Sequence, residues 1–197
     1  MKLVLASKNR KKLMEMNDIL SHLGIEVCSE AEAGVDLEVE ETGTTFEENS
    51  LLKARAVMEA SGLPAIADDS GLCVDCLNGA PGVYSARYGG EGVDDAGRYR
   101  LLLENMRGQM TRAAKFVGVI TCCFPNGDVL SARGECPGTI AYAPMGEGGF
   151  GYDPVFFVPE LKKTFAQLTP SEKNAVSHRG KAIRMFKSEL EKYLGHE

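Results

Sequence analysis

The sequence predicts an α/β fold built on a mixed β-sheet. Short apolar runs typical of buried strands alternate along the chain with longer segments whose apolar residues recur at helical spacing. Two of the strand-like runs, residues 116–124 and 129–135, are joined by Pro125-Asn126-Gly127-Asp128, in which Asn-Gly is a strong hairpin signal. Because a hairpin pairs its strands antiparallel, the sheet is expected to be mixed rather than wholly parallel.

The length of residues 1–197 fits one large domain or two small lobes that share a core. Hydrophobic residues make up 44% of the chain, which is enough for a sizeable core and argues against disorder. The formal charge of -6 argues against a general nucleic-acid binder, so any anion site must be local. No signal peptide is visible, and the longest mostly apolar run is too short to span a bilayer. We expect a cytoplasmic protein with no nucleic-acid and no membrane partner.

The cysteines do not change this expectation. Cys73 and Cys76 form a C-x-x-C pair, but no second pair or suitably spaced histidine completes a zinc site. A redox or metal role for this pair is the lesser alternative. Cys122 and Cys123 lie in a strand-like run, where packing as small apolar side chains is the simpler interpretation.

The N-terminal segment predicts a strand at residues 2–6 and a helix at residues 11–23. Ser7-Lys8-Asn9-Arg10-Lys11-Lys12 joins them and places four cations at the start of the helix. The helix dipole disfavours cations there by ~0.3–1 kcal/mol each. A bound polyanion offsets this cost, because phosphates bind to the free N–H groups of a helix N-terminus. A solvated cluster of charges is the alternative.

An acidic loop at residues 34–45 carries three glutamates, Glu38, Glu40 and Glu41. Thr45-Phe46-Glu47-Glu48 is a capping box that starts a helix running to about residue 61. Lys53 lies inside this helix and by itself is typical of a surface lysine.

Two adjacent carboxylates, Asp68 and Asp69, follow a short apolar strand at residues 64–67. Side chains alternate faces along a strand, so the two carboxylates cannot both enter one core. At least one must meet water, a metal ion or a buried cation, because an unpaired buried carboxylate is costly. Oxygen-rich sites at the ends of strands suit Mg²⁺ together with substrate phosphates. Ser70-Gly71 is expected to form a turn, and a polar turn that caps a helix is the alternative.

The second half of the chain predicts a helix at residues 95–106, with Ala96, Tyr99, Leu103 and Met106 on its buried face. Thr169-Pro170-Ser171-Glu172 is a second capping box. Ser177 is expected to cap a last helix that runs to about residue 193 and buries Ile183, Phe186, Leu190 and Tyr193. His178 and Arg179 then lie in its first turn, again where a cation is unfavourable unless it faces an anion or a polar ligand.

Residues 146–154 match the G-x-G-x-x-G pattern but not a dinucleotide-binding site. That motif requires a helix to follow, whereas Asp153-Pro154 forbids an immediate helix and residues 155–158 predict a strand. The glycines instead permit close backbone approach. Phe150 and Tyr152 offer flat faces on which a base can stack, and core packing is the alternative for both.

Five segments together resemble the inosine triphosphate pyrophosphatase family, and the bacterial branch is most similar. The segments, which extend the resemblance over essentially the whole chain, are Ser7-Lys8-Asn9-Arg10-Lys11-Lys12, Thr45-Phe46-Glu47-Glu48-Asn49, Ala67-Asp68-Asp69-Ser70-Gly71, Gly148-Gly149-Phe150-Gly151-Tyr152-Asp153-Pro154 and Ser177-His178-Arg179-Gly180. The resemblance implies an elongated α/β fold, with a mixed central sheet flanked by helices and two lobes around a deep active-site cleft. It also implies a homodimer that hydrolyses ITP, dITP or XTP to the monophosphate and pyrophosphate with Mg²⁺.

The resemblance also implies the residues of the site. Glu40 and Asp69 are the implied Mg²⁺ ligands, Asp69 is the implied proton acceptor, and Glu38 or Glu41 stays open in place of Glu40. The implied contacts to the triphosphate are Ser7, Lys8, Asn9, Arg10, Lys11, Lys12 and Lys53. The implied contacts to the rest of the substrate are Ser70, Phe150, Gly151, Tyr152, Asp153, Lys173, His178 and Arg179. Two other functions stay open, a pyrophosphatase for other modified nucleotides and a nucleotide-binding regulator without turnover.

Overall fold

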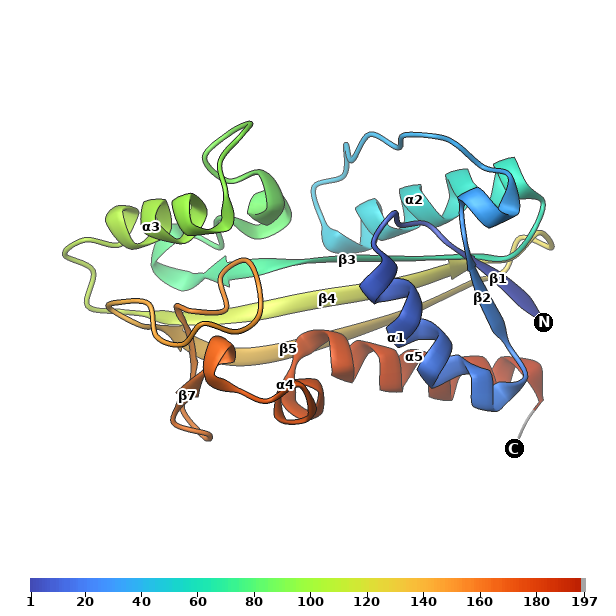
Figure 1. Cartoon of the computed structure of the whole chain (residues 1–197). Coiled ribbons are helices and arrows are strands. Elements are labelled where there is room, and N and C mark those ends of the chain that lie inside the picture. Colours follow the sequence, from blue (N-terminus) through green and yellow to red (C-terminus); the bar gives the residue numbers. More distant parts are fainter. Residues whose placement is uncertain (196–197) are drawn as a thin grey trace. The chain divides into compact units, whose positions relative to one another are not determined.

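The computed structural model describes residues 1–195, apart from the side chains of Lys11 and Glu15. Its strands form a seven-stranded sheet in the order β2-β1-β3-β4-β5-β6-β7 (Figure 1). β1 pairs in parallel with β2 and β3, whereas β6 pairs antiparallel with β5 and β7. The predicted mixed α/β sheet is therefore confirmed. The strands are β1 (Lys2–Leu5), β2 (Glu26–Ser29), β3 (Ala65–Val74), β4 (Ala113–Cys123), β5 (Val129–Ile140), β6 (Phe156–Val158) and β7 (Lys163–Thr164).

The helices begin close to where the local signals place them. They are α1 (Arg10–Leu20), α2 (Phe46–Ser61), α3 (Asp95–Asn105), α4 (Pro170–Val176) and α5 (His178–Leu194). Both predicted capping boxes are present, at Thr45 before α2 and at Thr169 before α4. Ser177 caps α5 as predicted, since its Oγ accepts from the N–H of Gly180 at 3.1 Å. Within residues 1–195, none of the helices combines the length and the apolarity needed to cross a bilayer.

The chain divides into two compact units. Unit 1 comprises Met1–Asp69, Gly118–Gly134 and Ala182–Glu197, and unit 2 comprises Ser70–Val117 and Glu135–Lys181.

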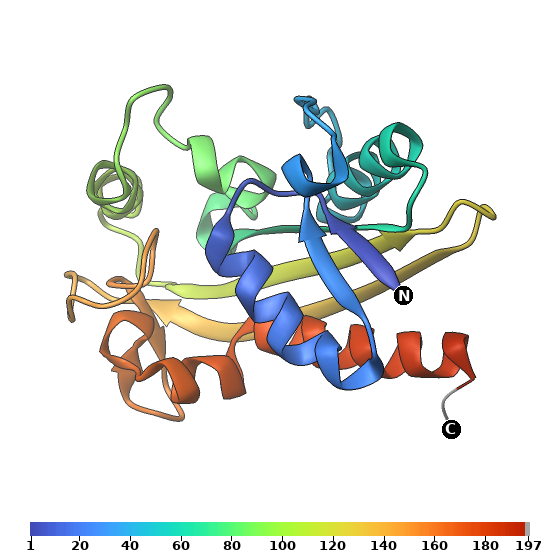
Figure 2. The same cartoon turned by 45° about the vertical axis from the view of Figure 1, so that its right-hand side comes forward.

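In unit 1, helices cover both faces of the sheet (Figures 1 and 2). Alternate residues of β1 show this clearly. Leu3 and Leu5 belong to the apolar cluster formed with α1 and α5, whereas Val4 belongs to the cluster formed with α2. β3 follows the same rule, with Ile66 in the first cluster and its two alanine neighbours in the second. Successive residues along this part of β3 therefore face, in turn, the layer of α1 and α5 and the layer of α2.

β3 corrects one prediction. The expected turn at Ser70-Gly71 is wrong, because the strand continues through both residues to Val74. The carboxylates of Asp68 and Asp69 do not end the strand, since each is paired with a lysine, as described below.

The apolar faces of two helices also differ in detail from the prediction. Leu102 is fully buried on α3, where the periodicity had selected Leu103 and Tyr99, which are only partly buried. Tyr193 is 38% exposed rather than buried, and its hydroxyl donates to Asp128 at 2.8 Å.

An aromatic cluster forms the centre of unit 2. The ring of Phe116 lies 4.7 Å from that of Phe156 and 5.6 Å from that of Phe165. All three rings belong to the apolar core of this unit, together with Leu102 and Tyr152. This core supports the glycine-rich segment 146–154.

Phe186→Ala is expected to lower the free energy of unfolding by about 3–5 kcal/mol, because its ring is fully buried between α5 and the sheet and its loss leaves a cavity. Thermal and denaturant unfolding measure the effect. The neighbouring Met185 is 53% exposed, so Met185→Ala is the matched control with an expected change below ~0.5 kcal/mol. Similar losses in both variants would contradict the placement of α5.

Candidate active site

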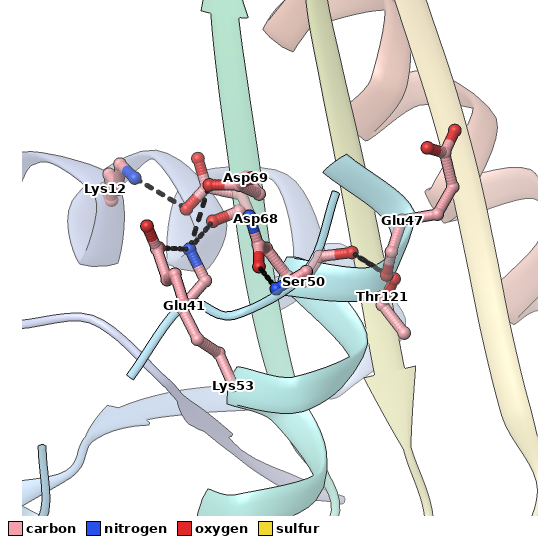
Figure 3. Close-up of polar contacts among 10 residues, drawn as sticks. Lys12, Glu41, Glu47, Ser50, Lys53, Asp68, Asp69 and Thr121 are labelled. Atoms are coloured by element: carbon pink, nitrogen blue, oxygen red, sulfur yellow. Dashed lines mark hydrogen bonds and ion pairs between the residues drawn. The ribbon is translucent and has the colours of Figure 1, made fainter. Parts of the chain in front are cut away.

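Two consecutive carboxylates on β3 leave opposite faces of the sheet and meet lysines from different helices (Figure 3). Lys12 of α1 donates from Nζ to Oδ1 of Asp68 at 2.7 Å. Lys53 of α2 donates from Nζ to Oδ1 of Asp69 at 3.1 Å. The carboxylates are only 5% and 9% exposed, so each needs the cation that the alternating faces of β3 bring to it.

Lys53 is the centre of this cluster rather than a surface lysine. Besides Asp69, its Nζ donates to Oε1 of Glu41 at 2.7 Å and to the carbonyl oxygen of Asp68 at 3.0 Å. The side chain is 17% exposed. The loop glutamate that meets Lys53 is therefore Glu41, whereas Glu40, the one implied by the resemblance, is exposed.

Burial and the neighbouring charges shift the pKa values of Asp69 and Lys53. Burial raises the pKa of Asp69 above its ordinary value, although Lys53 opposes the shift. Burial by itself lowers the pKa of Lys53, but Asp69 and Glu41 raise it overall. The second oxygen of Asp69, Oδ2, is buried and has no hydrogen-bond partner among the described residues 1–195.

The cluster offers carboxylate oxygens of the kind that Mg²⁺ prefers. Within the described part of the chain, no three His, Cys, Asp or Glu side chains converge as a complete metal site. A complete set is not required, since Mg²⁺ usually takes one or two protein carboxylates and completes its shell with water and substrate phosphates. Glu41 and the unpartnered oxygen of Asp69 fit this pattern.

The segment before α1 presents backbone and side-chain groups at a helix N-terminus. Ser7 is half-buried and its Oγ accepts from the N–H of Asn9 at 3.2 Å. Asn9, Arg10 and Lys8 are exposed, and Lys8 lies 3.9 Å from Asp36. Of the predicted phosphate ligands in this segment, the structure brings Lys12 to the carboxylates. The side chain of Lys11 lies outside the described residues.

A buried ion pair is also present in unit 2. The carboxylate of Asp153 is 3% exposed, forms an ion pair with Lys173, and accepts from the N–H of Phe150 at 2.9 Å. A Cβ atom on Gly149 would lie 2.0 Å from Oδ2 of Asp153, so the loop closes on this carboxylate only with glycine there. The buried aspartate therefore fixes the glycine-rich segment.

Phe150 carries two cations over its ring. Nζ of Lys173 lies 4.7 Å from the ring centroid and Cζ of Arg179 lies 5.9 Å from it. The ring itself is 59% exposed, so it is accessible to a ligand. Aromatic rings and guanidinium groups together are typical of sites that bind nucleotide bases.

Tyr152 and His178 are placed differently from Phe150. Tyr152 is 4% exposed and its hydroxyl donates to the carbonyl of Ser85 at 2.8 Å, so its ring serves the core and offers no stacking face. Burial also raises the pKa of Tyr152 well above its ordinary value. His178 is buried, and its ring stacks on Phe116 at 4.8 Å. Ser70 and Gly151 are half-buried.

Asp95 is a contact of the glycine-rich segment that the sequence analysis missed. Its Oδ2 accepts from the N–H of Gly151 at 2.7 Å, and its Oδ1 accepts from Arg98 at 2.9 Å. The sequence gives no signal for this role, because an acidic residue in the first turn of a helix is ordinary.

The comparisons with known proteins identify the family. The model of the Ham1 family matches residues 3–189. This chain belongs to the Ham1 family. Among curated Ham1 relatives, the dITP/XTP pyrophosphatase of Haemophilus influenzae is 52% identical over 193 residues, which cover 96% of this chain and 98% of the relative. The dITP/XTP pyrophosphatase of Escherichia coli O157:H7 is 48% identical over 189 residues, which cover 94% of this chain and 95% of the relative.

Solved Ham1 structures support the same fold. The Ham1 protein of Staphylococcus aureus superposes with a TM-score of 0.93 at 42% identity and covers 98% of this chain and 100% of its own. The HAM1 protein of Coxiella burnetii gives a TM-score of 0.94 at 44% identity, with 98% of this chain and 99% of its own covered.

Asp69→Asn is expected to stabilise this protein near neutral pH in the absence of metal. Burial raises the folded-state pKa of Asp69, so folding disfavours its charged form above that pKa, and the penalty is relieved as pH falls towards 3.8. The gain in Tm is expected to be ~2–4 °C for each kcal/mol removed. Thermal unfolding with a chelator across this pH range measures it.

Asp36→Asn is the control, since the Asp36 side chain is 99% exposed and the Tm is expected to change little at any pH. A gain for Asp69→Asn that grows towards acid pH would contradict the assigned effect of burial.

Proposed function

We propose that this chain hydrolyses ITP, dITP and XTP to the nucleoside monophosphate and pyrophosphate, and so removes non-standard purines from the nucleotide pool. The observation that carries the proposal is the cluster in which two buried carboxylates of β3 pair with one lysine of α1 and one of α2. It occurs in a chain that is 48–52% identical to proteins named dITP/XTP pyrophosphatase.

The lysines of unit 1 supply the positive charge for a triphosphate. Lys12 and Lys53 now bind carboxylates, and both can exchange these partners for phosphate oxygens of the same charge. The N–H groups at the start of α1 add further donors at a helix N-terminus. Positioning and charge neutralisation of this kind supply most of the rate enhancement in phosphoryl transfer.

Glu41 and Asp69 would hold Mg²⁺, and Glu41 replaces Glu40 in this role because it is the glutamate that reaches Lys53. When bound, Mg²⁺ lowers the pKa of a coordinated water and offsets phosphate charge. Asp69 positions the attacking water and accepts its proton. The water attacks the α-phosphorus in line with the departing pyrophosphate.

Unit 2 supplies the groups that recognise the base. Phe150 offers an exposed ring, and Arg179 and the N–H groups of the glycine-rich segment are donors. Hypoxanthine and xanthine carry an oxygen at position six, where adenine carries an amino group. Donors accept the oxygen and leave an amino group unpaired, and rejection of this kind reaches ~10⁴-fold.

Residues 1–197 act as one pyrophosphatase domain, and the active form is a homodimer in the cytoplasm, where the nucleotide pool lies.

The test of the main proposal is a panel of nucleoside triphosphates with detection of released pyrophosphate. Release from ITP, dITP and XTP far above that from ATP and GTP supports it. Preference for modified pyrimidines, or binding without release, contradicts it.

Asp69→Asn is expected to lower kcat by at least ~10²-fold with Mg²⁺ present, as for the loss of a general base. The change keeps the shape of the side chain and removes the charge that serves water and metal. Steady-state pyrophosphate release from ITP measures it, and Asp36→Asn is the control. Near-normal turnover of Asp69→Asn would exclude the assigned role.

Arg179→Ala is expected to lower kcat/KM for ITP much more than for ATP, because a donor to the six-position oxygen is lost. The measurement is the ratio of the two kcat/KM values. Arg184→Ala, an exposed arginine on the same helix, is the matched control. An unchanged ratio with both rates reduced would show that Arg179 binds phosphate or supports the structure instead.

A further inference from the structure

Two side chains on one face of helix α2 contact the acidic loop, in addition to the capping-box glutamate of the same helix. Asn49 and Lys53 are four residues apart, so their side chains lie one above the other. Oδ1 of Asn49 accepts from the N–H of Gly43 at 2.8 Å, and Nζ of Lys53 donates to Oε1 of Glu41 at 2.7 Å. The two contacts lie at the two ends of the stretch 41–43, so both ends of this stretch are tied to α2.

The Asn49 contact is costly to maintain. The side chain is fully buried, and its Nδ2 has no hydrogen-bond partner among residues 1–195. A buried donor without a partner is unfavourable, so an apolar side chain would be the simpler choice if the site only needed filling. The start of α2 does not depend on Asn49, because Thr45 and Glu48 already form its capping box. The acceptor for Gly43 is the feature that Asn49 contributes.

Gly43 completes the contact from the side of the loop. A Cβ atom there would lie 2.6 Å from Oδ1 of Asn49 and 2.7 Å from Cβ of Glu48. The conflict is one of space, so only glycine lets the loop backbone approach the helix this closely. The amide on the helix and the glycine in the loop are therefore two halves of one contact.

We propose that Asn49 is a positioning residue for the metal site: through Gly43 it fixes the backbone that presents Glu41 to Lys53 and Asp69. The inference rests on the proposed function, because it takes Glu41 and Asp69 as the carboxylates that bind Mg²⁺. Without the contact, Glu41 is free to leave the cluster and the affinity for the metal falls. Base recognition by unit 2 is unaffected.

The test compares Asn49→Ala, Gly43→Ala and the double variant in the full chain. Mn²⁺ binding without substrate, followed by electron paramagnetic resonance, gives the metal Kd directly. Each single variant is expected to weaken the metal Kd by about 10-fold or more, as outer partners of metal ligands do. The double variant is expected to be no weaker than the worse single one, because both changes break the same hydrogen bond.

Thr45→Ala is the matched control, since it removes the N-cap of the same helix but leaves the bond between Asn49 and Gly43 in place. It is expected to lower the Tm and to leave the metal Kd unchanged. In turnover, Asn49→Ala is expected to need about 10-fold more Mg²⁺ for half-maximal pyrophosphate release and to recover at saturating Mg²⁺, with the ratio of ITP to ATP unchanged.

Two outcomes overturn the inference and leave the proposed function standing. In the first, Asn49→Ala folds and has the same metal Kd as an active wild type. In the second, Thr45→Ala weakens metal binding as much as Asn49→Ala does. If Asn49→Ala does not fold, Gly43→Ala against Thr45→Ala decides in the same way. A wild type that neither binds Mn²⁺ nor releases pyrophosphate overturns the proposed function itself.

Discussion

The organisation of unit 1 depends on charge compensation at two adjacent buried carboxylates. Asp68 and Asp69 leave opposite faces of β3, and neither can stay ionised at low exposure without a cation. Helices on both faces of the sheet are thus an electrostatic requirement as well as a source of apolar burial. Lys12 of α1 serves one face and Lys53 of α2 serves the other. The same two ion pairs keep charged side chains inside a mostly apolar layer, where a ligand can bind them.

The same device recurs in unit 2 with other residues. Asp153 is buried, pairs with Lys173 of α4, and also holds the backbone of the glycine-rich segment through Phe150. In both units, therefore, a buried carboxylate holds the ammonium group of a lysine inside a site to which we assign a ligand. A polyanionic substrate can bind such a lysine in place of the carboxylate. No charge is left unpaired if a cation then binds the carboxylate in place of the lysine.

Local signals predicted much of the fold, and long-range contacts account for what they missed. The capping box at Thr45 and the Asn-Gly turn depend only on near neighbours, so they were readable. The continuation of β3 past Asp69 was not, because lysines from distant helices permit it. The hydroxyl of Tyr152 binds the carbonyl of Ser85, 67 residues away, and the contact of Lys53 with Glu41 lies in a loop that has no periodicity.

The two ion pairs on opposite faces of β3 also fix the register of this strand. Both faces of β3 in unit 1 are buried and lined by small or branched apolar residues, so the apolar pattern of Ala65–Val74 alone discriminates weakly between alignments along the strand direction. A slip by one residue would exchange the two helix layers, and a slip by two would leave both buried carboxylates without the lysine that compensates them. The two ion pairs therefore favour the observed alignment of β3 over an alignment shifted along the strand direction.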